Sequence, residues 1–203
     1  MDLLTKKDQQ RDDLRTRLID AAEGRIARQG LAGLKARDVT ADASCALGAL
    51  YNAFEDLDDL ILHVSSRTLK KLGHALAATQ TSGLAPGQAL AALAQGYVDF
   101  ALTNRPLWSA LFNHWLPAGR DVPDWHLADH AALIEQIVIP LAILRPDLAT
   151  GDLHLRARTL FAAVHGVVQL SLEGRFVGAP QDKIASEVAA LVTAMTRGIV
   201  SSG

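Results

Sequence analysis

Residues 35–54 read KARDVTADASCALGALYNAF, and this stretch decides the fold class. Its apolar spacing predicts two short helices, residues 35–42 and 46–53, joined by a tight turn. Neither helix is long enough to be stable alone in water, so both must pack against a larger body. Two short helices across a tight turn, followed by a long helix, are typical of a helix-turn-helix that reads DNA.

Longer helices are predicted on both sides of this stretch. Upstream, apolar residues from Leu14 to Ile26 recur at helical spacing, and Gly30 stands where that helix would stop. Downstream, Asp56 is a candidate N-cap for a long helix, with Asp59 three residues later. Four carboxylates near this first turn also suit the positive end of a helix dipole: Glu55, Asp56, Asp58 and Asp59.

The remainder of the chain shows helical spacing and no convincing strand. After a loop at 80–87, a helix is predicted from Pro86 to a break at 104–106, followed by a short helix ended by Pro117. A helix over 124–144 is perturbed at Pro140, and the next is capped by Asp152 and ended by Gly174. Pro180 opens the last helix, whose apolar stripe is Ile184, Val188, Leu191, Met195 and Ile199. We therefore expect an all-α fold of about nine helices. Residues 1–56 would form the helix-turn-helix domain, and residues 57–203 a ligand-binding and dimerisation domain.

Composition and charge limit how the protein can bind DNA and indicate its cellular compartment. Apolar residues make up 49% of the 203-residue chain, which is enough for a buried core, and the net charge is −2. DNA binding must therefore come from a local patch, because a strongly basic coat is absent. A single cysteine, Cys45, favours a reducing compartment. The charged N-terminus is unlike a signal peptide, and no apolar run reaches the roughly 18–20 residues of a membrane span. We expect a cytoplasmic protein with no membrane partner.

The second short helix must present small or polar side chains to enter the major groove. The expected outward residues are Leu47, Gly48, Ala49 and Asn52, while Leu50 and Phe54 are expected in the core. Lys35 and Arg37 are candidate phosphate ligands, helped by Arg25 and Arg28.

Several of these residues resemble the N-terminal signature of the TetR family of transcriptional regulators. The matching residues are Ile19-Asp20-Ala21-Ala22, Gly30, residues 34–39, residues 48–54 and Leu60-Ile61. Farther on, residues 161–166 (Phe-Ala-Ala-Val-His-Gly) followed by Leu170 resemble the tryptophan-histidine-glycine signature of one TetR C-terminal class, with Phe161 in place of the tryptophan. The resemblance implies that Tyr51 touches the DNA backbone and that Phe54 packs the third helix against the first.

The chain also departs from this family pattern in the DNA-reading segment. The departures are Lys35 in place of a Ser or Thr, Ser44 in place of a turn glycine, Ala46 in place of a capping Ser or Thr, Leu47 in place of a basic or polar residue, and Leu57 in place of a lysine. Each missing cap is worth about 1 kcal/mol, and each missing cation leaves a phosphate without a protein ligand. We therefore expect weak DNA binding, further weakened by the carboxylates near residue 57.

An apolar or aromatic effector is expected in the C-terminal part. Its candidate binding residues are Tyr97, Phe100, Trp108, Phe112, Trp115 and His130, although the same aromatic spacing equally suits an ordinary core. His126 and His130 lack a third metal ligand, so we expect a solvated or pocket-lining pair, with no metal and no cofactor. Two apolar stripes, at residues 152–172 and 182–200, predict a homodimer through a four-helix bundle.

These residues predict a ligand-responsive DNA-binding repressor. Activation instead of repression stays open. The alternative is a TetR-fold protein that binds lipid or another apolar ligand and has no operator. We expect no enzymatic activity, because the sequence has no GxSxG, no phosphate-cradling glycine loop and no convincing carboxylate pair.

Overall fold

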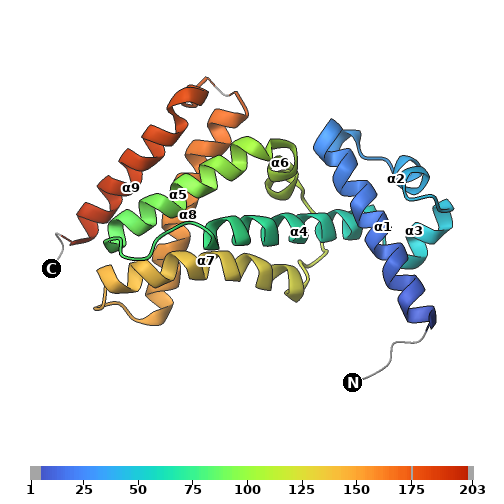
Figure 1. Ribbon diagram of the computed structural model, residues 1–203, viewed down its shortest axis with the longest axis horizontal. Coiled ribbons are helices and arrows are strands. Elements are labelled where there is room, and N and C mark those ends of the chain that lie inside the picture. Colours follow the sequence, from blue (N-terminus) through green and yellow to red (C-terminus); the bar gives the residue numbers. More distant parts are fainter. Residues whose placement is uncertain (1–5, 175, 201–203) are drawn as a thin grey trace. The chain divides into compact units, whose positions relative to one another are not determined.

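The computed structural model describes residues 6–174 and 176–200, and the side chains of residues 6–174 and 176–197. Over these residues the chain forms nine α-helices and two short 3-10 helices (Figure 1). They are α1 (Lys6–Gln29), η1 (Leu31–Gly33), α2 (Ala36–Asp42), α3 (Leu47–Ala53), α4 (Leu57–Ala77), α5 (Pro86–Thr103), α6 (Arg105–Asn113), α7 (Asp124–Leu144), α8 (Thr150–Leu172), η2 (Gln181–Lys183) and α9 (Ile184–Val200). The predicted all-α class is confirmed.

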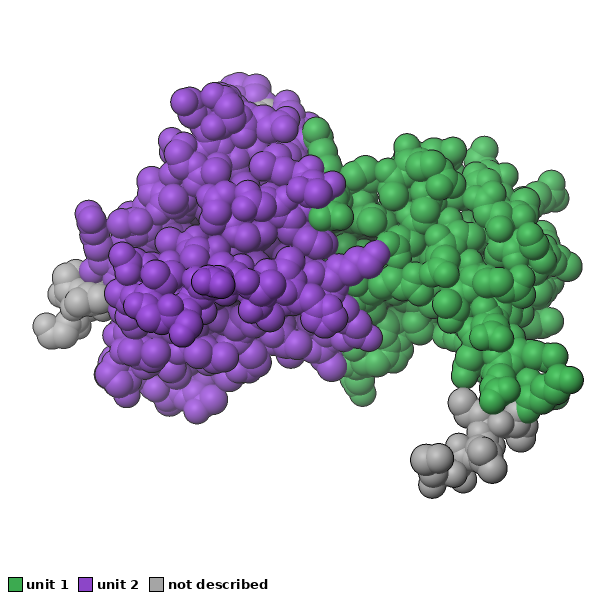
Figure 2. Space-filling model, in the orientation of Figure 1, with its two compact units in different colours: residues 1–69, 104–126 green, residues 70–103, 127–203 purple. Residues whose placement is uncertain are grey.

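Packing divides the chain into two compact units, which Figure 2 colours separately. Unit 1 comprises residues 1–69 and 104–126, and unit 2 comprises residues 70–103 and 127–203. Helices α4 and α7 therefore contribute residues to both units. The predicted division into a DNA-binding domain and a ligand-binding domain between residues 56 and 57 stays a prediction, because the two compact units reflect packing and not function.

Unit 1 is built around one apolar core. Leu18 and Ile26 of α1, Leu50 of α3 and Val64 of α4 are buried together in it, and α6 packs against α1. The guanidinium of Arg15 lies 4.3 Å from the ring centroid of Phe54, and it also donates a hydrogen bond to the carbonyl of Ala53. The two short helices thus gain their stability from longer neighbours, as their length requires.

The start of α4 is fixed by side-chain capping. The backbone N–H of Asp59 donates to Oδ1 of Asp56 at 2.8 Å, and the N–H of Glu55 donates to Oδ2 of Asp59 at 3.1 Å. The first bond satisfies an N–H that the helix leaves unpaired, and the second fixes the residue before the N-cap. This confirms Asp56 as the predicted N-cap.

Three predicted boundaries were wrong. Helix α1 begins at Lys6, well before Leu14, because the Lys, Gln and Arg residues there are good helix formers on a solvated face. Helix α6 ends at Asn113, ahead of Pro117, because His114 already has extended backbone. Helix α8 begins at Thr150, so Asp152 lies in its first turn, where a carboxylate suits the helix dipole without capping.

Unit 2 is a bundle in which α5 packs against α8 and α9 (Figure 1). Ile184 and Val188 lie on the buried stripe of α9, as predicted. Leu191 and Met195 are only half-buried, Val192 is buried instead, and Ile199 lies outside the described side chains. Helix α7 is long and apolar enough to cross a membrane by length and composition alone. Leu133 and Leu141 of this helix are buried in unit 2, and 17% of its most apolar window is buried in all.

The turn between α2 and α3 places Ser44 in the left-handed region, with φ of 52°. A residue with a Cβ in this region lowers the stability of the folded chain by about 1–2 kcal/mol. Glycine avoids this strain but lowers stability by about 0.4–1 kcal/mol, because it gives the unfolded chain more conformational freedom. We expect Ser44→Gly to raise the free energy of unfolding by about 0.5–1 kcal/mol. Urea unfolding followed by circular dichroism measures it. Ser44→Ala keeps the strained backbone and should give no gain; an equal gain from both variants would contradict the assignment to φ.

Candidate DNA-binding and ligand-binding sites

Helix α3 presents one face to solvent and the other to the core of unit 1. Leu47, Gly48, Tyr51 and Asn52 are exposed, Tyr51 to 52%, while Ala49 is half-buried. Leu50 and Phe54 are buried in the core, as expected. A Cβ placed on Gly48 would meet no atom within 4 Å, so the backbone at this position is open to approach. Gly48 and Asn52 give this face the small and polar groups that a groove-reading helix needs, and Leu47 adds an apolar one.

The basic residues near this face differ in their availability. Lys35 and Arg37 are exposed at the start of α2. Arg25 instead forms an ion pair with Asp42 at 2.7 Å, and the hydrogen bond to that carboxylate raises the pKa of Arg25. Arg28 approaches Asp42 less closely, at 3.6 Å. Arg25 therefore fixes α1 to α2, and the expectation that it helps to bind phosphate gains no support.

Two of the carboxylates near residue 57 are paired with an arginine of the same unit, and a third lies near a histidine. Arg120 contacts Asp56 at 2.5 Å and Glu55 at 3.1 Å. Nε2 of His114 lies 3.4 Å from Oδ1 of Asp58, although burial lowers the pKa of His114. Because Arg120 offsets two of the charges, the expected repulsion of DNA is weaker than four free carboxylates would produce.

The departures from the family pattern have visible local consequences. Lys35 and Ala46 stand at the N-caps of α2 and α3, and neither helix has a side-chain cap hydrogen bond. Leu57 is half-buried and packs against the apolar core of unit 1. A lysine at that position would therefore lose core packing, which corrects the expectation that Leu57 occupies a free phosphate-contacting position.

A cluster that the sequence did not reveal joins the starts of α4 and α7 in unit 1. The ring of His63 stacks on Trp125, with centroids 4.5 Å apart, and meets Phe54 edge-on at 5.4 Å. Nη2 of Arg15 lies 2.9 Å from Nε2 of His63. These residues are far apart in the sequence, so no local pattern could have indicated their contact.

The neighbouring histidine corrects an expectation. His126 is buried, and its Nδ1 lies 2.8 Å from Oγ of Ser66, so it does not belong to a solvated face. His130, four residues later, is half-buried in unit 2, and burial lowers its pKa. Among the described residues, no group of three His, Cys, Asp or Glu side chains could hold a metal ion.

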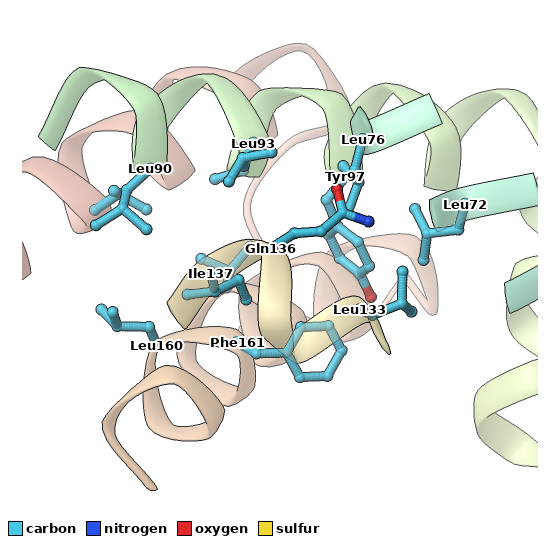
Figure 3. A pocket seen from close by; sticks show the side chains of 13 residues that line it. Leu72, Leu76, Leu90, Leu93, Tyr97, Leu133, Gln136, Ile137, Leu160 and Phe161 are labelled. Atoms are coloured by element: carbon cyan, nitrogen blue, oxygen red, sulfur yellow. The ribbon is translucent and has the colours of Figure 1, made fainter. Parts of the chain in front are cut away.

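An apolar cavity of about 50 Å³ lies within unit 2 (Figure 3). Its walls are Leu72 and Leu76 of α4, Leu90, Leu93, Ala94 and Tyr97 of α5, Leu133, Gln136 and Ile137 of α7, Leu160, Phe161 and Val164 of α8, and Val192 of α9. A cavity that binds benzene measures roughly 150 Å³, so side chains must move before a larger ligand fits.

A polar pair adjoins the cavity. The hydroxyl of Tyr97 lies 2.7 Å from Nδ1 of His165, and the ring of Phe161 stacks on His165 with centroids 5.5 Å apart. Burial lowers the pKa of His165. The imidazole is therefore neutral at pH 7, and Nδ1 can accept the hydrogen bond from Tyr97.

The predicted effector-binding residues are not gathered around this cavity. Tyr97 lines it; of the others, Phe100 is buried in α5, Trp108 and Phe112 contact each other in unit 1, Trp115 is 83% exposed in unit 1, and His130 lies elsewhere on α7. Helical spacing of aromatic residues predicts an apolar face, but it cannot distinguish a core from a cavity. The cavity walls are chiefly Leu, Ile and Val, which look the same as core residues in the sequence.

Residues 90–195 match the family profile described as tetracyclin repressor-like, C-terminal domain. The chain belongs to the TetR family. No match was found among curated proteins. A Rhodococcus sp. RHA1 protein of unknown function is 26% identical, with a TM-score of 0.69 over 91% of this chain and 94% of that one.

Two further solved structures share the fold. RolR, solved in complex with the ligand resorcinol, is 22% identical, with a TM-score of 0.66 over 96% of both chains. A TetR transcriptional regulator from Rhodococcus sp. RHA1 is 17% identical, with a TM-score of 0.64 over 92% of this chain and 97% of that one. TetR-family regulators bind DNA operators and small-molecule ligands, and the family is not one of enzymes. The chain is therefore a TetR-family transcriptional regulator with a DNA-binding helix-turn-helix.

The lowered pKa of His165 makes the stability of this regulator depend on pH. In acid the unfolded chain takes up a proton that the folded imidazole resists, so stability is full above the ordinary histidine pKa and falls below it. We expect the melting temperature to drop between pH 7.5 and pH 5, and to drop less in His165→Gln. Differential scanning calorimetry at both pH values measures it. An equally large drop in the variant would mean that other groups carry the effect.

Proposed function

We propose that this TetR-family regulator is a repressor that binds its operator as a homodimer and is released by a small apolar effector. The observation that carries the proposal is the path of α4. The helix gives Leu60 and Val64 to the core on which α3 packs, and it gives Leu72 and Leu76 to the cavity wall. A ligand in the cavity therefore touches the same helix that supports the DNA-reading helices.

Release follows from linkage between the two sites. Two half-sites on one face of B-DNA lie about 34 Å apart, so a dimer binds only with matching spacing of its reading helices. A ligand that favours another position of α4 disfavours that spacing. Ligand and DNA then weaken each other by the same factor, since coupling between binding sites is reciprocal.

The cavity chemistry supports an uncharged apolar or aromatic effector. Its walls are apolar except for the amide of Gln136 and the hydroxyl of Tyr97. Burying an unpaired charge there would be costly. The RolR structure, which holds resorcinol in a similar fold, supports a small aromatic molecule as one candidate class.

We propose that DNA is read by Lys35, Arg37, Leu47, Gly48, Ala49, Tyr51 and Asn52, in the cytoplasm. Arg37→Ala should lower the slope of log K against log salt by about 0.9 for each phosphate that is left without its arginine, hence by about 1.8 in a dimer. A duplex that the full-length protein binds is first selected by retention of genomic fragments on the protein. Fluorescence anisotropy at several salt concentrations then gives the slope of log K against log salt. Lys71→Ala, at an exposed residue of α4 in unit 2, is the control. Equal slopes in both variants would remove Arg37 from the DNA site.

The outward face of α8 supports the dimer. Leu155, Ala162 and Leu170 are exposed on this face and Gly166 is half-buried on it, at spacings of seven, four and four residues. A Cβ on Gly166 would meet no atom within 4 Å of the same chain. Small residues let a second helix approach closely, so this face fits a four-helix bundle across a two-fold axis.

Gly166→Glu should convert the dimer to a monomer at micromolar concentration. The substitution adds no clash within the chain, but it would bury two like charges near the two-fold axis. Sedimentation velocity measures the mass, and circular dichroism checks that the helices persist. Ala131→Glu, on an exposed position of α7 in the same unit, should leave the dimer intact. A wild-type mass of 21.7 kDa would refute the dimer altogether.

A further inference from the structure

Unit 2 also contains an open groove of about 460 Å³ between the α4–α5 connection and α7. Its outer wall includes Ile139 and Ile143, which are 66% and 67% exposed. Two large aliphatic side chains held in water beside a groove are unfavourable unless something covers them. The groove is thus a surface that gains from an apolar occupant.

The groove and the apolar cavity share a wall. Leu76, Leu93 and Gln136 line both spaces. Nε2 of Gln136 donates a hydrogen bond of 3.2 Å to the carbonyl of Gly73 on α4. Figure 3 shows the Gln136 side chain extending across from α7 toward Leu76. A rotation of this one flexible side chain would remove part of the partition and break its hydrogen bond to α4.

The lining defines the chemistry of the occupant. Among the described residues that line the two spaces, none is Asp, Glu, Lys or Arg. The polar side chains of the groove are the hydroxyls of Thr79 and Thr81 and the amide of Gln136. A ligand with an apolar chain and one hydroxyl group matches this lining, because the hydroxyl can exchange hydrogen bonds with these groups and needs no ionic partner.

We propose that cavity and groove form one binding site for an elongated, uncharged, hydroxyl-bearing ligand. The apolar chain enters the cavity past Gln136, and the hydroxyl group stays in the groove. Binding replaces the hydrogen bond of Gln136 to Gly73, so the ligand acts on α4 directly. The inference rests on the proposed effector role of the cavity, and it adds the shape of the ligand, its charge and its route of entry.

A series of 1-alkanols tests the joined site. The full-length protein without DNA is loaded with N-phenyl-1-naphthylamine, and 1-butanol to 1-dodecanol are titrated to displace the fluorescence. The Kd should fall about fourfold for each added methylene group, and it should go on falling for chains too long for the cavity alone. Octanoate at pH 8 should bind far more weakly than 1-octanol, because its charge finds no partner. A Kd that stops falling at short chains, or equal binding of octanoate, would overturn the proposal.

Two matched variants of α7 separate the groove from general surface effects. Ile139→Glu should weaken 1-decanol binding about tenfold or more and 1-butanol binding much less, since only the longer chain extends from the cavity along the groove beside its hydroxyl group. Leu127→Glu, at a residue of the same helix that is 50% exposed and does not line the groove, should bind both alcohols like the wild type. Equal losses in both variants would overturn the proposal, as would no loss in Ile139→Glu.

A third variant tests the partition. Gln136→Ala should raise the association rate constant of 1-decanol in stopped-flow measurements and leave its Kd no higher. An unchanged association rate constant would overturn the role of Gln136. These measurements contain no DNA. A protein that binds duplex and releases it to another small molecule, yet binds no alkanol, would keep the proposed function and lose this inference.

Discussion

The burial of α4 is the constraint on which both sites depend. Its first half fills the core of unit 1 with Leu60 and Val64, and its second half gives Leu72 and Leu76 to the cavity of unit 2. A helix is stiff along its axis because each turn is hydrogen-bonded to the next. The carboxylate of Asp56, which accepts a hydrogen bond from the N–H of Asp59, keeps the first turn of α4 from fraying.

The helix-turn-helix could be predicted closely because its constraints are local. The buried Leu50 and Phe54, the outward Asn52 and the capping Asp56 all follow from helical spacing and capping chemistry within a few residues. The turn is also informative: the family glycine is missing at Ser44, and the backbone nevertheless keeps the left-handed geometry. The structure tolerates this strain because the flanking helices are held by the core.

The ligand cavity could not be predicted, because its constraints are distant in the sequence. Trp108 and Phe112 have the spacing of a binding face, yet they pack in unit 1, and the cavity walls come from five separate helices. Pairings such as Tyr97 with His165 depend on which helices become neighbours. Charge pairing is hidden in the same way, since Arg120 lies more than 60 residues from the carboxylates that it contacts.

The positions of the tryptophans have a practical meaning for spectroscopy. The chain has three, Trp108, Trp115 and Trp125, and all belong to unit 1, whereas the cavity lies wholly within unit 2. Trp125 stacks on His63, the residue before Val64 on the helix that continues to the cavity. The three indoles and the cavity walls therefore share no residue and no unit, so tryptophan emission reports on the surroundings of unit 1.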